Sequence, residues 1–209
     1  MYRNRIKRLL DILLSACGIL CLSWLLLLLA VAIKLDSPGP VFFRQKRVGI
    51  GKRHFQILKF RTMRIDTPHD MPTHLLHDPE QYITRMGRFL RKTSLDELPQ
   101  LLNILKGDLS IVGPRPERPE IAAQYCEEMP EFALRLQAKA GLTGYAQVYG
   151  KYNTTPYDKL QMDLMYIAHP SLIEDLKIML ATVKILFMPE STEGVAEGAT
   201  TAMNNENLK

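Results

Sequence analysis

The sequence has little cysteine, no internal repeat and no strong excess of either charge. Of its 209 residues only three are cysteines: Cys17 and Cys21 lie one helical turn apart in an apolar run, and Cys126 stands alone. This spacing excludes a disulfide framework, so nothing in the chain requires an oxidising compartment. The 27 Lys and Arg residues against 22 Asp and Glu give a net charge of +5. Such a modest excess fits an anionic partner without choosing among phospholipid, phosphorylated substrate and nucleic acid.

Charged residues are also absent from Ile12 to Ile33, a run of about 22 residues that can cross a bilayer as one helix. Basic residues flank the run on both sides, and positive charge favours the cytoplasmic side. A segment that enters and leaves on the same side satisfies both flanks, but only Gly18 and Ser23 offer a break near its middle. The residues alone therefore favour a plain transmembrane anchor. A cleavable signal peptide ending at Ala30-Val31-Ala32 fits poorly, because the run is too long.

The rest of the chain predicts a mixed domain over 37–188, followed by a disordered polar tail over 189–209. Val41 to Phe43 and His54 to Phe60 read as a β-hairpin closed by Gly49-Ile50-Gly51, and Gly141 to Gly144 reads as a turn. The histidine-rich loop from Asp66 to Pro79 matches no strong zinc template. Helices are expected over Pro79 to Leu90, Ser94 to Leu105, Pro119 to Met129, Glu131 to Ala140, Pro156 to Tyr166 and Ile173 to Phe187. The last of these either packs on the core or lies at a membrane interface.

Two adjacent carboxylates, Asp96 and Glu97, stand at the start of one expected helix. Ser94-x-x-Glu97 has the pattern of a capping box, which needs no catalysis. Asp96 is not needed for that box, and the first turn of a helix favours an ionised carboxylate. A fixed, ionised carboxylate suits a covalent phosphoryl acceptor. Its attack on a phosphate calls for a cation, and Glu97 is the adjacent ligand for Mg²⁺.

Arg115 lies between Pro114 and Pro116, whose fixed φ angles stiffen the backbone on both sides. A guanidinium on a stiff loop can bind phosphate oxygens in bidentate fashion at little ordering cost. Equally, the loop can be a structural turn whose arginine pairs with a carboxylate. Arg88 and Arg91 precede the carboxylate pair, and they either line the same pocket or are surface charges of a helix.

Together these segments resemble the bacterial sugar transferases, the monotopic phosphoglycosyl transferases, in their minimal form and up to about Phe187. The resemblance is carried by several motifs in family order and spacing. They are Arg8-x-x-Asp11, Ser37-Pro38-Gly39-Pro40-Val41-Phe42-Phe43, Lys59-Phe60-Arg61-Thr62-Met63, Thr93-Ser94-Leu95-Asp96-Glu97-Leu98-Pro99-Gln100, Asn103-x-x-Lys106-Gly107-Asp108, Val112-Gly113-Pro114-Arg115-Pro116 and Gly141-Leu142-Thr143-Gly144.

The resemblance implies transfer of a sugar-1-phosphate from a UDP-sugar to a polyprenyl phosphate such as undecaprenyl phosphate, the first membrane step of a surface glycan or exopolysaccharide. By this likeness Asp96 attacks the β-phosphate and UMP leaves, so that a phosphosugar-aspartyl intermediate forms and then passes its group to the lipid. Glu97 would hold Mg²⁺ and Arg115 would bind phosphate. Lys59 and Arg88 fall where family members carry basic residues of the active site.

The resemblance also implies an α+β fold: a mostly helical cytoplasmic domain with a small β-hairpin, interfacial amphipathic helices and a re-entrant membrane helix over 1–36. The domain would lie on the cytoplasmic face of the bacterial inner membrane, in contact with phospholipid. One position departs from the family, which often has Ser-Pro where this chain has Ser23-Trp24. Without the proline, a kink must rest on Ser23 and on packing.

Two other functions compete with this one. A non-catalytic, membrane-anchored scaffold of a glycan-assembly complex has no need of Asp96, Glu97 and Arg115 together. A nucleic-acid binder is suggested only by the net charge, and no recognised module supports it, so nucleic acid is not an expected partner. The sequence does not reveal the sugar, the glycan pathway or the oligomeric state, for which a homodimer would be unsurprising.

Overall fold

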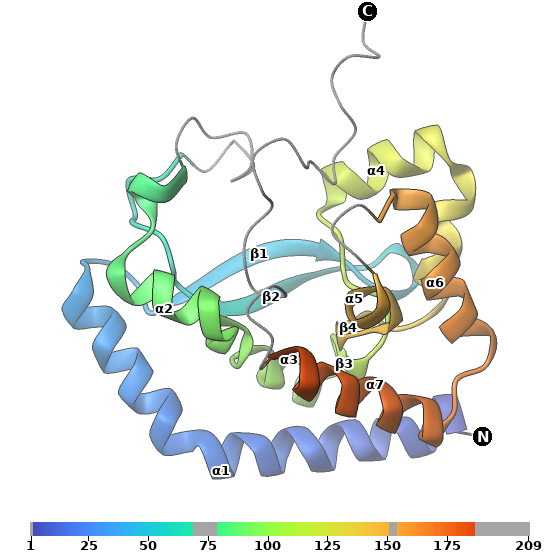
Figure 1. Ribbon diagram of the computed structural model, residues 1–209, viewed down its shortest axis with the longest axis horizontal. Helices are drawn as coiled ribbons and strands as arrows, with labels where there is room; N and C mark the ends of the chain where they lie inside the picture. The colour runs from blue at the N-terminus through green and yellow to red at the C-terminus, as the bar shows by residue number, and fades with distance from the viewer. Residues whose placement is uncertain (1, 69–78, 151–153, 187–209) are drawn as a thin grey trace, which may run out of the picture.

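A computed structural model describes residues 2–68, 79–150 and 154–186 of the chain (Figure 1). Most of these residues are helical, and the strands form two separate two-stranded sheets. The expected α+β class with a small hairpin is therefore confirmed. The expected tail over 189–209 and most of the histidine-rich loop lie outside the described residues.

Helix α1 (Lys7–Asp36) follows a π-helical turn, η1 (Tyr2–Ile6), and contains the expected apolar run. It is long and apolar enough to cross a membrane, with a mean hydropathy of 2.7 over 18 residues. The helix is continuous, yet its ribbon changes direction part way along (Figure 1). Ser23 Oγ donates to the carbonyl of Leu20 at 2.9 Å. Serine hydroxyls that bond back to the preceding turn commonly bend helices, so this bond supplies a cause for a bend without proline.

Both ends of α1 are attached to the same globular body. Near the N-terminal end, the buried Asp11 carboxylate accepts from Ser110 Oγ at 3.0 Å and from the Ile111 amide at 2.9 Å. Towards the C-terminal end, Leu29 and Ile33 are buried in a cluster of apolar side chains of the domain. Burial of these two residues removes apolar surface from solvent, which stabilises the contact. The middle of the helix remains mostly exposed.

The expected hairpin is confirmed, with a longer first strand than predicted. Strands β1 (Phe42–Val48) and β2 (His54–Phe60) pair antiparallel, from Phe42 opposite Phe60 to Val48 opposite His54. A 3₁₀ turn, η2 (Ile50–Lys52), joins them. Asn103 holds the hairpin from helix α3 (Gln100–Lys106), because its side chain donates to the carbonyl of Gln56 at 2.8 Å and accepts from the Leu58 amide at 2.9 Å.

The prediction of a capped helix that begins at Ser94 is wrong. Ser94 follows α2 (Arg85–Thr93) in the left-handed conformation, with φ of 56°, and its side chain makes no capping bond. A 3₁₀ turn, η5 (Leu95–Glu97), comes next, and α3 (Gln100–Lys106) begins only after Pro99. An N-cap residue needs extended backbone, so the left-handed Ser94 serves as the end of α2 instead.

The second sheet was not predicted. Strands β3 (Ser110–Val112) and β4 (Gly141–Thr143) pair in parallel, so the prediction of a turn at Gly141 to Gly144 is also wrong. A Cβ at Gly141 would collide with the main chain of Gly113, so glycine permits the close approach of the two segments. The local sequence resembles a turn, whereas the pairing depends on a segment about 30 residues earlier.

The later helices lie together near the second sheet (Figure 1). Helix α7 (Leu172–Leu186) buries Ile178 completely, whereas Ile173 and Leu180 are 67% and 71% exposed. One face of α7 therefore packs on the domain, and another presents apolar side chains. The expected α-helix from Glu131 is a 3₁₀ helix. The elements are η4 (Pro79–Tyr82), α4 (Pro119–Glu128), η6 (Pro130–Gln137), α5 (Tyr145–Tyr149), α6 (Pro156–Ala168) and α7 (Leu172–Leu186).

Replacing Gly87 with alanine is expected to destabilise the fold by about 1–3 kcal/mol, the usual range for overpacking. A Cβ at this buried position of α2 would collide with the main chain of Thr62. Chemical denaturation in detergent measures the effect. Lys92→Ala, on an exposed position of the same helix, is the control and should change stability by less than about 0.5 kcal/mol. Equal stability of the two variants would contradict the packing of α2 on Thr62.

Candidate functional site

Asp96 and Glu97 lie in the 3₁₀ turn η5, between α2 and α3, beside the end of strand β2. Asp96 lines a cavity of about 630 Å³ together with Lys59, Arg91 and Arg118. Phe42 and other residues of the hairpin supply apolar walls. A 3₁₀ turn separates consecutive side chains by about 120°, yet Lys59 reaches both carboxylates, with Nζ 2.7 Å from Glu97 Oε1 and 3.9 Å from Asp96 Oδ2. A cavity with apolar walls and convergent charges is typical of a substrate site.

Glu97 receives two cations on one oxygen. Lys59 Nζ and Arg115 Nη2 each donate to Oε1 at 2.7 Å. Burial raises the pKa of Glu97, but the attraction of Arg115 and Lys59 outweighs it and holds that pKa well below its usual range. Glu97 is therefore ionised, and its side chain does not close a capping box. Arg115 thus pairs with a carboxylate, as expected of a structural turn. That carboxylate is Glu97, a member of the dyad itself.

Asp96 has a different environment from its neighbour. Its one ion pair in the described structure is a long one, 3.9 Å from Oδ2 to Lys59 Nζ. Burial raises the pKa of Asp96; Lys59 and the more distant Arg91 and Arg115 lower it without cancelling the effect. Two adjacent carboxylates thus have pKa values that are pushed in opposite directions, which is typical of groups with separate tasks.

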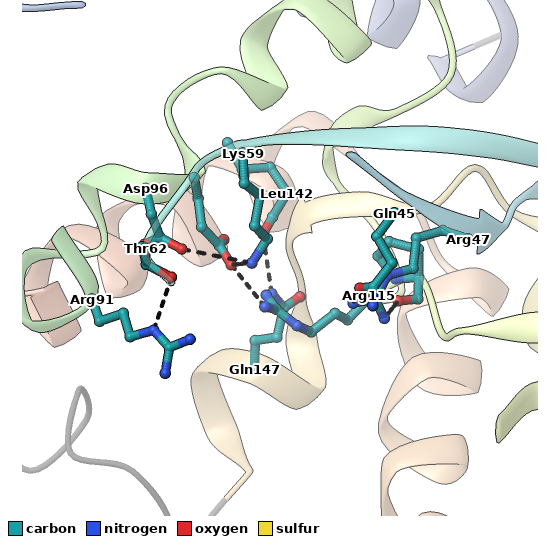
Figure 2. A network of polar contacts seen from close by, with 11 residues as sticks. Gln45, Arg47, Lys59, Thr62, Arg91, Asp96, Arg115, Leu142 and Gln147 are labelled. Atoms are coloured by element: carbon teal, nitrogen blue, oxygen red, sulfur yellow. Dashed lines mark hydrogen bonds and ion pairs between the residues drawn. The ribbon is translucent and has the colours of Figure 1, made fainter. Parts of the chain in front are cut away.

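Arg91 joins this site and Arg88 does not. Arg91 Nε donates to Thr62 Oγ1 at 3.1 Å, and its other nitrogens have no partner among the described residues (Figure 2). Burial lowers the pKa of Arg91, while the charge of Asp96 opposes this effect. Arg88 lies on the exposed side of α2, where its side chain is 66% exposed and its Nε lies 3.7 Å from Glu80. The structure brings Arg88 into contact with neither carboxylate.

Several residues of the site carried no sequence signal. Arg47 donates from Nη1 to the carbonyl of Pro116 at 3.1 Å, and burial, together with the charge of Arg115, lowers the pKa of Arg47 to about 10. Gln147 donates to the carbonyl of Leu142 at 3.0 Å (Figure 2). Thr62 lies in a recognised motif, but nothing in the motif indicated its bond to Arg91.

The donor atoms suit a metal that is shared with a substrate rather than held by protein alone. No group of three or more His, Cys, Asp or Glu side chains converges within the described ranges. Oε2 of Glu97 and both oxygens of Asp96 accept no hydrogen bond from the described part of the chain. Mg²⁺ commonly takes one or two carboxylates and completes its six ligands with substrate phosphates and water.

Comparison with known proteins agrees with these motifs. The chain is 47% identical over 192 residues to the UDP-glucose:undecaprenyl-phosphate glucose-1-phosphate transferase of Caulobacter vibrioides, covering 88% of this chain and 71% of that protein. It is 41% identical over 184 residues to the UDP-N-acetylgalactosamine-undecaprenyl-phosphate N-acetylgalactosaminephosphotransferase of Aeromonas hydrophila, covering 87% and 43%.

A third relative has nearly the same length as this chain. The uncharacterised sugar transferase EpsL of Bacillus subtilis is 39% identical over 188 residues, and the match covers 90% of each protein. The chain thus spans nearly all of EpsL but less than half of the Aeromonas relative. The family described as bacterial sugar transferase matches residues 2–189. From this match, which includes every residue of the cavity around Asp96, the chain belongs to the bacterial sugar transferase family.

Proposed function

We propose that this protein transfers a sugar-1-phosphate from a UDP-sugar to undecaprenyl or a related polyprenyl phosphate and releases UMP. The observation that carries the proposal is the cavity that Asp96 lines together with Lys59 and Arg91, next to a Glu97 that Lys59 and Arg115 keep ionised. The relatives from Caulobacter and Aeromonas act, by their names, on UDP-sugars and undecaprenyl phosphate. Because those two use different sugars, the proposal names the class of donor and not the sugar.

In the first half-reaction, an oxygen of Asp96 attacks the phosphorus that carries the sugar. A new P–O bond forms to the carboxylate, and the P–O bond to the bridging oxygen breaks, so that UMP leaves with the electron pair. Burial leaves this carboxylate poorly solvated and more basic than usual, which favours attack while it stays ionised. The unpartnered nitrogens of Arg91 and the half-exposed Arg115 are suited to bind the phosphate oxygens.

In the second half-reaction, an oxygen of the polyprenyl phosphate attacks the same phosphorus. The bond to Asp96 breaks, the carboxylate is regenerated, and the product is a polyprenyl diphosphate sugar. Both steps place an anion against an anion, so each needs the nearby cations to offset repulsion. Mg²⁺ bound when phosphate is present would neutralise further negative charge, and Glu97 Oε2 and Asp96 are the protein oxygens that would hold it.

The attachment of α1 supports a re-entrant placement in the membrane. Asp11 near one end and Ile33 near the other both contact the same domain, which favours a helix that enters and leaves on one side. A spanning helix would have to pull one of these contacts away from the domain. Exposed apolar side chains of α1 and α7, including Trp24 and Leu180, suit burial in the lipid. The proposal places the domain on the cytoplasmic face of the bacterial inner membrane.

A non-catalytic scaffold is the alternative to this reaction. The described geometry disfavours it, because Asp96, Lys59 and Arg91 line one cavity, while Lys59 and Arg115 both pair with the adjacent Glu97. A scaffold has no need to keep a partly buried acid such as Asp96 without a close partner, since such a group costs stability. The two functions differ in one measurable respect, which is release of UMP.

Purified protein supplied with Mg²⁺, undecaprenyl phosphate and a panel of UDP-sugars is expected to release UMP with at least one donor. Asp96→Asn should reduce the rate by at least about a thousandfold, as loss of a nucleophile usually does. Without the lipid acceptor, the wild type should release about one UMP per protein and gain the mass of the phosphosugar. A luminescent UMP assay and intact-protein mass spectrometry measure the two quantities.

Glu127→Gln, an exposed acid of α4, is the control for this assay and should keep the wild-type rate. Addition of EDTA should stop release, and excess Mg²⁺ should restore it. Release that continues unchanged in Asp96→Asn would rule out the aspartyl intermediate. No release with any donor would favour the scaffold.

The fall of kcat/KM at acidic pH should be set by protonation of Asp96. Its pKa is raised above the usual carboxylate range by burial and would be higher still without Lys59. Since attack needs the ionised form, activity should fall as pH drops through that pKa, and Lys59→Gln should move this acidic limb to higher pH. Lys46→Gln, an exposed position on the same hairpin, should not move it. If the acidic limb of kcat/KM stays at the wild-type pH in Lys59→Gln, Asp96 is not the group whose protonation limits activity.

Membrane topology can be tested with single cysteines in a variant that lacks the three natural ones. Arg5→Cys and Leu35→Cys place thiols near the two ends of α1, at exposed positions. Because a re-entrant helix keeps both ends in the cytoplasm, a membrane-impermeant maleimide should label neither in intact spheroplasts and both after lysis. Labelling of one end alone in intact spheroplasts would establish a spanning helix.

A further inference from the structure

The loop that carries Arg115 has few backbone N–H groups with which to form hydrogen bonds. Pro114 and Pro116 lack backbone N–H groups, so this stretch can be held by hydrogen bonds mainly through its carbonyl oxygens. Behind the loop lies a small cavity of about 20 Å³, lined by Pro114, Pro116, Cys126 and Arg135 among others. Close packing of side chains is therefore incomplete at the back of the loop, and its position depends more on those carbonyl bonds.

Four consecutive carbonyls of the loop each accept a hydrogen bond. Two of the donors are backbone amides: Gly141 donates to the carbonyl of Pro114 at 2.9 Å, and Val48 donates to the carbonyl of Glu117 at 3.0 Å. The two central donors are arginine side chains. Arg135 Nη2 donates to the carbonyl of Arg115 at 3.0 Å, and Arg47 donates to the carbonyl of Pro116 at 3.1 Å.

Arg135 is the more deeply buried of these two arginines, with 4% of its side chain exposed. Its Nε and Nη2 donate to Asp163 Oδ2 at 3.0 and 2.6 Å, and Nη1 donates to Glu117 Oε1 at 3.3 Å. The guanidinium also lies over the ring of Phe132, 4.7 Å from its centre. These partners fix the orientation of the plane, so that the remaining bond direction of Nη2 points at one carbonyl oxygen.

Stability alone explains this arrangement poorly. A buried ion pair such as Arg135 with Asp163, whose side chain is 2% exposed, must recover the cost of removing two charges from water. Apolar residues of the same volume often serve stability as well or better. What apolar residues cannot supply is a donor for the carbonyl of Arg115.

We infer that Arg135, held by Asp163, is a positioning residue that sets the distance of Arg115 from Glu97 and from the phosphate of the donor. The inference rests on the proposed function for its catalytic consequence. Its structural part, the link from Arg135 through the loop to Glu97, does not depend on that function. Arg135 lies behind the loop and contacts neither carboxylate of the dyad in the described structure.

The test is a mutant cycle in the full-length protein in detergent, with Arg135→Lys, Arg115→Lys and the double variant. Arg135→Lys keeps the positive charge beside Asp163 but loses the planar guanidinium that binds several acceptors at once. It should lower kcat/KM for the UDP-sugar about 10–100-fold, as small misplacements of catalytic groups do. If Arg135 acts through Arg115, the double variant should be within about threefold of Arg115→Lys alone. If the loss of kcat/KM in the double variant equals the product of the two single losses, the two residues act independently and the inference is overturned.

A second readout needs no turnover. The contact of Arg115 Nη2 with Glu97 Oε1, 2.7 Å long in the wild type, should be lengthened or lost when the loop is displaced. In ¹⁵N NMR spectra of the arginine side chains, assigned with Arg115→Lys, the Arg115 signal should therefore move in Arg135→Lys. Arg8→Lys is the matched control, since Arg8 also donates to two carbonyls, those of Ile104 and Leu105, and to none of the loop. It should leave the Arg115 signal unchanged.

The outcomes separate the two proposals. A wild type that releases no UMP with any donor would end the proposed function, and the Arg115 signal would still decide the role of Arg135. An Arg115 signal that stays at its wild-type position in a folded Arg135→Lys protein would overturn the positioning role. Asp163→Asn, which keeps the shape of the carboxylate and weakens its hold on Arg135, repeats the test if Arg135→Lys does not fold; the same displacement of the Arg115 signal is expected.

Discussion

The shared oxygen of Glu97 is the contact on which the arrangement of the site depends. Lys59 reaches it from strand β2 and Arg115 reaches it from the loop after β3, each at 2.7 Å. Three segments that are distant in sequence are thereby joined at one atom. Either cation alone would leave a poorly solvated carboxylate half compensated, so each contact favours the other. The two cations keep Glu97 ionised, and the negative charge of Glu97 in turn holds the two cations in place.

The same contact leaves Asp96 in its distinctive state. Because Glu97 takes the short contacts of Lys59 and Arg115, Asp96 receives their charge only from a distance, at 3.9 Å in the case of Lys59. Its burial is then only partly offset. A carboxylate that is close to cations, yet bound tightly by none, keeps its lone pairs for a substrate. This difference between adjacent residues comes from the 3₁₀ turn, which gives the two side chains different neighbours.

The attachment of α1 places this chemistry relative to the apolar surface. Asp11 accepts from the residues that begin β3, and the loop with Arg115 follows directly after that strand. The apolar helix α1 and the loop of Arg115 therefore share one structural support. The proposed lipid acceptor must bring its phosphate from the bilayer to the cavity, and a helix that is fixed to the domain at both ends keeps these two places at a constant separation.

Much of the site could be read from the sequence, and the errors have a common cause. The dyad, Lys59, Arg91 and Arg115 are brought together as expected, and the hairpin is where alternation predicted it. The expected capping box at Ser94 and the turn at Gly141 are both wrong. In each case the local pattern was genuine, but a partner elsewhere decided the outcome: Lys59 and Arg115 occupy Glu97, and Ser110 to Val112 pairs with Gly141 to Thr143.

The sequence by itself determined which chemical groups are present, the long apolar helix and the family, because these depend on residue type, composition and spacing. Only the tertiary structure decided that Arg88 points away from the dyad, that Thr62 holds Arg91, and that the buried Arg135 supports the loop of Arg115. These contacts join residues 20 to 30 positions apart or lie on one side of a helix. Hydrogen bonds depend on distances of a few tenths of an ångström, which packing sets and which sequence spacing does not contain.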